Sequence, residues 1–302
     1  MRDNKATIAL ILFMLCSGTI PLFLKYFTPY IDGWTANGYR YAVAALMYLP
    51  FLLIKIKAKK VDSKVWKLAL IPTAFNIVLQ STWAWAPYYI DPGLIGFLGR
   101  STLIWSIIGS FILFSDERPL LGSKRFWFGL VIAIIGFTGL SLGGKDIPYG
   151  GTLFGIILVL TSCLFMSAYL LSVRYYFRKT DSRIAFSVIA LYTSIGTIIM
   201  MLFLGETMAF IRLPLKINFL IVLSAIIGIG VAHVLYYVAQ KRLGSAISSS
   251  AVLLSAFYTA FLSSFIFDEK LTIFQWVAGL LITIGGVLLL TAQGKVKPQA
   301  SQ

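Results

Sequence analysis

The stretch DERPLLGSKRFWFGLVIAIIGFTGL, residues 116–140, has a counterpart in DEKLTIFQWVAGLLITIGGVLLL, residues 268–290. In both copies an acidic pair precedes a short connector and then an apolar run. Glycines stand seven residues apart in each run, at Gly129 and Gly136 in the first copy and at Gly279 and Gly286, 150 residues later, in the second. The repetition of this segment predicts an internal duplication in which each copy is the last segment of one half of the chain.

The composition around these copies is far too apolar for a soluble protein. Hydrophobic residues make up 59% of the 302 residues and charged residues 12%, and the mean hydropathy is +0.87. Soluble proteins carry about 45–50% apolar and about 25% charged residues. The surplus predicts membrane spans, because apolar runs of about 20 residues match a hydrocarbon core of about 30 Å. Ten such runs can be drawn, at 6–27, 35–54, 68–89, 93–114, 124–142, 152–173, 184–204, 217–238, 246–267 and 273–293.

The basic residues are concentrated on one side of these runs. With the N-terminus inside, 19 of the 26 Lys and Arg residues fall on the inner side and 4 on the outer side, while Lys25, Arg40 and Arg100 fall within runs. The positive-inside rule then predicts an inner or plasma membrane protein with both termini in the cytoplasm. The same distribution explains the net charge of +15 as positive charge along the inner membrane face, so the charge does not indicate a nucleic-acid partner.

Five runs in each half require the second half to enter the membrane in the opposite sense. The expected fold is therefore an all-α polytopic membrane protein with ten transmembrane helices as two inverted five-helix repeats. The repeats span residues 6–142 and 151–293, and a short cytoplasmic tail follows at 294–302. Inverted halves that meet near the midplane are a recurrent plan for alternating-access transporters.

Several short segments, taken in order on this ten-run frame, form a family pattern. They are Ser17-Gly18 with Phe23-Leu24-Lys25, then Arg40-Tyr41-Ala42, Asp116-Glu117-Arg118, Leu235-Tyr236-Tyr237 with Lys241-Arg242-Leu243-Gly244, and Asp268-Glu269-Lys270. Over nearly its whole length the chain resembles the EamA-like branch of the drug/metabolite transporter superfamily. The resemblance implies a permease for small metabolites, often an exporter, that works by alternating access. Where that family commonly has proline in the fourth and ninth spans, this chain has Thr102 and Ser255-Ala256, so a proline-directed helix break is not implied.

The acidic residues are informative by their positions. All eleven lie in predicted loops or at the ends of runs. This placement argues against a proton or sodium pathway built on a buried carboxylate, and it favours facilitated exchange or diffusion.

Cations and the single histidine within runs are candidate binding groups, because an ionisable residue in a span is costly. Arg100 would bind a substrate carboxylate or phosphate, or else snorkel to the outer interface or bond carbonyl groups. Lys25 and Arg40, near the outer ends of their runs, are expected to snorkel. His233, the only histidine, would relay a proton or gate the pathway, or else form a hydrogen bond between helices.

Polar and aromatic side chains in the third, eighth and ninth runs complete the candidate substrate site. Asn76, Gln80 and Trp83 share one helical face by their spacing of four and three. They would line a cavity, although Asn76 could instead hold helices together. Ser255 and Tyr258 would face the same cavity, with Tyr237 a weaker candidate, whereas most hydroxyl residues of the ninth run would serve close helix packing.

Two further features have structural explanations. The four paired glycines would pack the fifth run against the tenth or form a homodimer contact. Glu117 and Glu269 would cap the helices that follow them or pair with nearby Lys and Arg residues.

No enzyme constellation, catalytic residue, metal-ligand cluster or cofactor-binding motif is visible in the sequence. The expected partners are a small-molecule substrate, such as an amino acid or a related zwitterionic or anionic compound, and the lipid bilayer. A membrane scaffold or lipid-handling protein that transports nothing is the alternative.

Overall fold

In the computed structural model of the chain, residues 4–86, 89, 98–142, 153–266 and 272–292 are described. Every regular element in these ranges is helical. In chain order the elements are α1 (Asn4–Phe27), α2 (Gly33–Lys57), α3 (Ser63–Trp85), the 3₁₀ turn η2 (Gly99–Ser101), α5 (Thr102–Leu113), the 3₁₀ turn η3 (Arg118–Gly122), α6 (Lys124–Leu142), α7 (Leu153–Phe177), α8 (Ser182–Leu204), α9 (Ala209–Arg212), α10 (Leu215–Ala225), the π-helical segment η4 (Ile226–Val231), α11 (Ala232–Leu243), α12 (Ser245–Ala251), α13 (Leu253–Ile266) and α14 (Ile273–Thr291).

The helix bounds follow the apolar runs closely. Within the described residues, five helical segments are long and apolar enough to cross a membrane, and shorter apolar helices lie at Thr102–Leu113, Ser245–Thr259 and Trp276–Thr291. The ninth run is divided between α12 and α13 at Val252 without any proline. The predicted start of the fourth run, residues 93–97, lies outside the described residues.

Aspartate side chains set the first residues of three long helices. Asp32 accepts a hydrogen bond from the Thr35 backbone N–H at 2.9 Å at the start of α2. Asp62 and Asp181 occupy the same position before α3 and α8. An N-cap carboxylate satisfies an otherwise unbonded N–H and interacts favourably with the helix dipole. The starts of these helices are therefore determined by residues close to them in the sequence.

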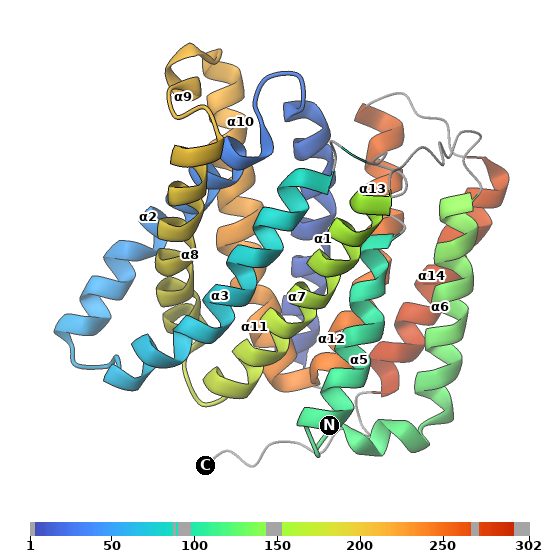
Figure 1. The fold of residues 1–302 in the computed structure, drawn as a ribbon. Helices are drawn as coiled ribbons and strands as arrows, with labels where there is room; N and C mark the ends of the chain where they lie inside the picture. The colour runs from blue at the N-terminus through green and yellow to red at the C-terminus, as the bar shows by residue number, and fades with distance from the viewer. Residues whose placement is uncertain (1–3, 87–88, 90–97, 143–152, 267–271, 293–302) are drawn as a thin grey trace.

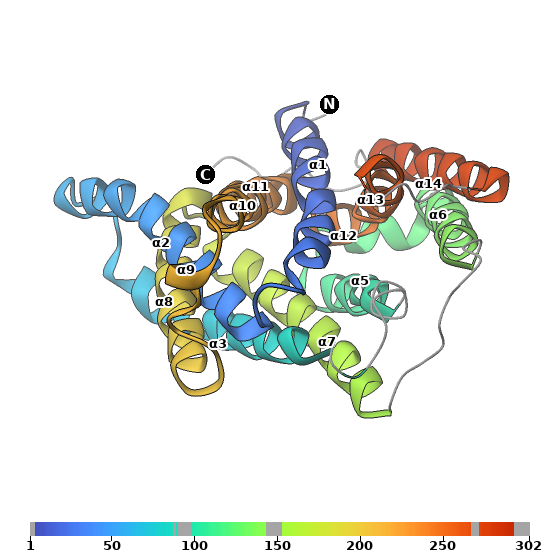
Figure 2. The same ribbon diagram turned by 90° about the horizontal axis from the view of Figure 1, so that it is seen from above.

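The two duplicated helices, α6 and α14, pack against each other along their length (Figures 1 and 2). A Cβ atom added at Gly136 would lie 2.7 Å from the carbonyl oxygen of Ala278, so the two backbones meet with no room for a side chain. Gly129 and Gly285 form the same kind of contact, whereas Gly279 and Gly286 face Phe257 and Leu254 of α13. Packing of the fifth run against the tenth is thus confirmed for Gly129 and Gly136. Gly279 and Gly286 instead make room for side chains of α13.

The helices form two groups with α1 between them, as seen from above in Figure 2. One buried core joins α2, α3, α7, α8 and α11, and a second joins α5, α6, α12, α13 and α14 to α1. Phe13 of α1 packs against both cores, and its ring centroid is 4.7 Å from that of Tyr236. Helix α1 therefore connects the two groups together with α11, which contributes residues to both cores, and α5 also packs against α7.

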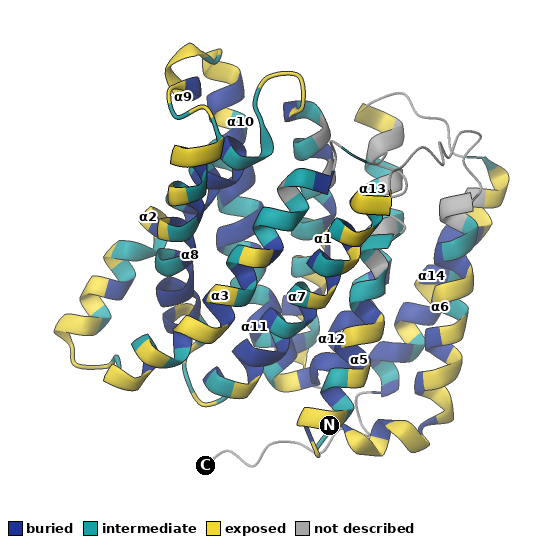
Figure 3. Ribbon diagram, viewed as in Figure 1, coloured by how far each residue is buried: buried dark blue, intermediate teal, exposed yellow. Residues whose placement is uncertain are grey.

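The outer faces of the helices are strongly apolar. Leu46 of α2, Ile112 of α5 and Phe128 of α6 are 65%, 66% and 62% exposed, and exposed residues follow the outside of the bundle in Figure 3. A contiguous apolar exterior of this extent marks contact with lipid rather than water. The fold is that of a multi-pass membrane protein, in which α1 begins and α14 ends at the same, lower end of the bundle in Figure 1.

Candidate functional site

A hydrogen-bonded polar network joins α2, α3 and α8. The Asn76 amide donates to the Tyr41 hydroxyl and to the Thr193 hydroxyl, both at 3.1 Å. Gln80, one turn further along α3, donates to the Tyr41 hydroxyl at 3.0 Å. Because Asn76 is only 1% exposed and both amide hydrogens are used within the protein, it holds the three helices together. The half-buried Gln80 lies next to a gap, too small for a water molecule, that is lined by Trp34, Asn37, Ser81, Thr197 and Met200.

An aromatic cluster continues this network toward α7 and α11. His233 stacks on Phe186 with 5.5 Å between ring centroids, and its Nδ1 lies 3.0 Å from the Ile229 carbonyl oxygen. A neutral ring bonded in this way carries its hydrogen on Nδ1 and leaves Nε2 as an acceptor. The Tyr237 hydroxyl hydrogen-bonds the Tyr169 hydroxyl. Tyr237 therefore belongs to the same buried core as Tyr41, and the half-buried His233 packs its ring against Tyr169, Phe186 and Tyr237 of that core.

Trp83 lies further along α3, against α7. It packs on Ala86, Val159 and Cys163, and a Cβ added at Gly99 would lie 3.6 Å from its ring. The turn η2 that carries Arg100 is thus adjacent to Trp83, while the Arg100 side chain is outside the described part of the structure.

The two candidates of the ninth run sit elsewhere, where α13 crosses α1. A Cβ added at Gly18 would meet the Tyr258 ring at 2.5 Å and the Ser255 carbonyl oxygen at 3.3 Å. The Ser255 hydroxyl donates to the Val252 carbonyl oxygen at 2.7 Å, at the start of its own helix. Thr259 makes the cross-helix bond, to the Gly18 carbonyl oxygen at 2.7 Å. Ser255 and Tyr258 therefore occupy the α1–α13 contact rather than the network around Gln80 and His233.

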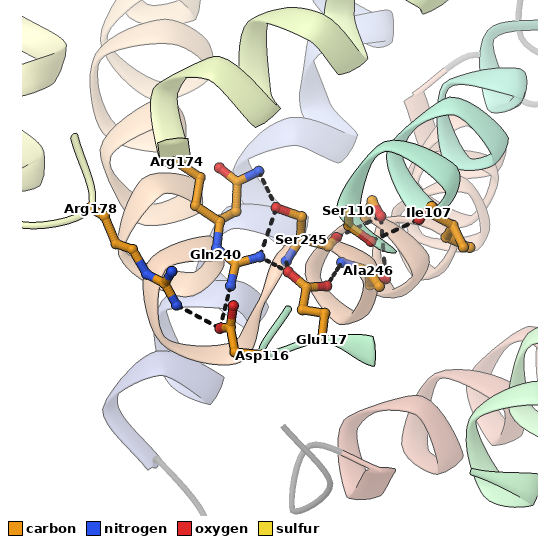
Figure 4. Close-up of polar contacts among 10 residues, drawn as sticks. Ile107, Ser110, Asp116, Glu117, Arg174, Arg178, Gln240, Ser245 and Ala246 are labelled. Atoms are coloured by element: carbon orange, nitrogen blue, oxygen red, sulfur yellow. Dashed lines mark hydrogen bonds and ion pairs between the residues drawn. The ribbon is translucent and has the colours of Figure 1, made fainter. Parts of the chain in front are cut away.

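A buried ion cluster, which the sequence analysis did not assemble, closes one end of the bundle (Figure 4). Glu117 is fully buried and accepts hydrogen bonds from the backbone N–H groups of Ser245 at 2.6 Å and Ala246 at 2.7 Å. It also forms an ion pair with Arg174 of α7. Glu117 therefore caps α12, which begins 128 positions further along the chain, and not the helix that follows it. Of the two predicted roles, pairing with a basic residue is the one that the structure shows, although that residue, Arg174, is distant in the sequence.

Asp116 completes this cluster from the same turn. Its Oδ2 atom lies 2.9 Å from Arg174 Nη2 and 2.7 Å from Arg178 Nη2. The Arg174 guanidinium also lies 4.0 Å from the centroid of the Phe114 ring. Gly244, with φ +93°, is required next to this cluster, since a Cβ there would meet the Glu117 carboxyl carbon at 2.9 Å. Both halves of the chain thus contribute to one charged contact.

Arg40 departs most from expectation. Its side chain does not snorkel to an interface, because the residue is only 4% exposed and its Nη2 atom lies 3.4 Å from the Cβ position at Gly228 of η4. Its Nε atom is buried without a hydrogen-bond partner. The Asp and Glu side chains that the structure describes lie at helix starts and turns, such as Asp32, Glu117 and Glu206.

The described residues offer no cluster of three or more His, Cys, Asp or Glu side chains that could hold a metal ion. The site is instead a set of neutral amides, hydroxyls and aromatic rings with one buried guanidinium nearby. Such groups can bind a polar or anionic organic molecule by hydrogen bonds.

The comparisons with known proteins agree with this architecture. An "Uncharacterized transporter" of Haemophilus influenzae is 26% identical over 194 residues, which are 63% of this chain and 63% of the relative, so the match spans less than two thirds of that protein. A solved crystal structure superposes with a TM-score of 0.77 over 95% of this chain and 96% of the other, at 14% identity, which is a likeness of fold.

The family comparison covers the chain twice. The model of the EamA-like transporter family matches residues 4–142 and again residues 153–292. Together these matches take in nearly all the helices, including both copies of the duplicated unit. The chain belongs to the EamA-like transporter family.

Proposed function

We propose that this protein is a ten-span permease of the inner or plasma membrane that moves a small zwitterionic or anionic metabolite, such as an amino acid, by alternating access. The family supports a membrane transporter. The observation that carries the substrate class is the polar network of Asn76, Gln80 and Tyr41, with the ring of His233 in the adjoining aromatic cluster, inside an apolar exterior. Buried polar groups in a membrane protein commonly line a substrate path.

The proposed halves are residues 6–142 and 151–293, inserted in opposite senses with both termini in the cytoplasm. Their positive charge on one side supports this orientation. In this arrangement the cluster of Glu117, Arg174 and Ser245 lies at the cytoplasmic end and joins the first half to the second. Opening toward the cytoplasm would require these bonds to break, so the cluster acts as the inner closure of the transport cycle.

Flux measurements test the transport activity directly. Purified protein is reconstituted in liposomes, and counterflow is measured for amino acids, organic acids and nucleoside-like compounds. We expect saturable flux for at least one compound class. An absence of saturable flux across the whole panel would contradict the proposal and favour a membrane scaffold or a lipid-handling protein.

Cysteine labelling tests alternating access independently of the substrate. Cys16 and Cys163 are first replaced, and single cysteines are then placed at Gln80, Trp83 or Ser250. A membrane-impermeant maleimide should reach these sites from either side, with the preferred side changing when substrate is added. Phe128→Cys is the matched control, since its lipid-facing side chain, 62% exposed in the structure, should remain unlabelled from both sides.

A further inference from the structure

We infer that Arg40 is an oxyanion-binding residue that receives the carboxylate of the transported metabolite. This inference rests on the proposed transport function and adds a residue and a charge preference to it. The site lies between α2, α1 and η4.

The depth of Arg40 excludes an interfacial role. The residue is the eighth of α2, which starts at Gly33, so it lies about 10 Å along the helix from that end. It is 4% exposed. Among the residues that the structure describes, its guanidinium has no hydrogen bond, ion pair or ring contact, and the buried Nε–H is unsatisfied.

Arg174 is a second buried arginine, and its structural role is evident from its partners within the protein. The Nε atom of Arg174, like that of Arg40, has no hydrogen-bond partner, but its terminal nitrogens bond Asp116, Glu117 and Ser245, and the guanidinium lies over a phenylalanine ring. A buried cation without such partners is strongly unfavourable. The contrast between the two arginines indicates that the partner of Arg40 comes from outside the chain.

The segment beside the Arg40 guanidinium places a glycine, Gly228, next to its Nη2 atom rather than an acidic or bulky side chain. The nearest turn is η4, a π-helical segment, and insertions of this kind occur frequently at functional sites. Gly228 has no side chain, so its backbone lies close to Arg40 Nη2 and to Ile20 of α1. The other titratable groups that interact with the Arg40 charge are Tyr41 and His233, neither of which is an acid that could neutralise it.

The chemistry of the guanidinium defines the ligand. Its planar array of five N–H donors matches two oxygens of one carboxylate, and lysine cannot reproduce that geometry. The expected ligand is therefore an acid with a planar carboxylate. Inorganic phosphate shares the oxyanion chemistry and serves as a second probe.

A binding measurement tests the site without requiring transport. The protein in zwitterionic phosphatidylcholine nanodiscs is titrated with sodium acetate, sodium phosphate or, as reference, sodium chloride, and its thermal unfolding is recorded. We expect acetate to raise the midpoint above the chloride reference for the wild type and R125Q, an exposed control, but not for R40Q. Equal stabilisation of wild type and R40Q by acetate would overturn the inference.

A flux measurement tests the ligand preference. Each acid is compared with an amide that lacks the carboxylate: alanine with alaninamide, lactate with lactamide and succinate with succinamide. For a transported acid, R40Q should weaken the apparent affinity by about 10- to 100-fold, R40K should recover only part of it, and transport of the amide should change little. If R40Q weakens acid and amide equally, Arg40 does not bind the carboxylate, even though transport itself is established.

Failure of the proposed function would look different. If wild-type protein moves no compound yet acetate stabilises it through Arg40, the oxyanion site exists without transport. To test whether a lipid supplies the oxyanion, anionic phosphatidylglycerol is added to the nanodiscs. If that lipid removes the effect of acetate in the wild type, the headgroup phosphate occupies the site and the assignment to a metabolite is wrong.

Discussion

The Glu117→Gln substitution offers the sharpest test of the charged closure. Glutamine keeps the size of the side chain but removes its charge, and it can accept only one of the two backbone hydrogen bonds from Ser245 and Ala246. Arg174 then loses one of its two carboxylate partners at a site where its side chain is 1% exposed. Breaking a buried ion pair costs about 3–5 kcal/mol. Because Asp116 remains as a partner, we expect the lower end, about 3 kcal/mol.

The assay is thermal unfolding of purified protein in nanodiscs. At roughly 2 °C per kcal/mol for a chain of this size, the midpoint should fall by about 6 °C. Glu206→Gln is the matched control, because Glu206 is exposed, and it should lie within about 0.5 kcal/mol of the wild type. A midpoint for Glu117→Gln equal to that of Glu206→Gln would refute the view that Glu117 stabilises this end of the bundle.

A double-mutant cycle separates the pair from the individual residues. Arg174→Gln alone leaves the Glu117 carboxylate buried with two N–H donors but no cation. The double variant should therefore be less destabilised than the sum of the two single variants. A cysteine at Ser250 in the Glu117→Gln background should also label faster from the cytoplasmic side, since in the proposed transport cycle the weakened contact favours the inward-open state.

Three further results are expected. Asn76→Ala leaves two buried hydroxyl partners without their bonds and should cost about 1–2 kcal/mol in thermal unfolding; a value near zero would contradict its structural role. Gly136→Ala should destabilise by about 1–3 kcal/mol, because its Cβ would meet backbone atoms at 2.7 Å, while Gly122→Ala, with open space around it, should be neutral. Partial burial opposes ionisation of Asp181, but hydrogen bonds and charge from Arg183 outweigh it and lower the pKa of the carboxyl below 3.8. Its stabilising contribution is then complete above that pH and lost as the pH falls through the lower folded-state pKa, so wild type and Asp181→Asn should differ more at pH 6 than at pH 3.

The sequence by itself determined where the helices begin and end. Apolar runs long enough to span a bilayer alternate with turn residues, and Asp32, Asp62 and Asp181 mark helix starts through bonds to residues two or three positions away. These signals are local, so they can be read without knowing what each helix touches. The duplicated glycines likewise indicated a close helix contact.

Only the tertiary structure decided what those helices bring together. Glu117 stands in a turn and was expected to act on residues near it in the sequence, yet its partners are Arg174 and Ser245, 57 and 128 positions further along the chain. Spacing likewise placed Arg40 near the end of its run without showing that its side chain turns inward toward η4. The periodicity of a helix gives the depth of a residue along the axis, whereas its rotation toward lipid, a neighbouring helix or a ligand is set by packing between segments distant in the chain.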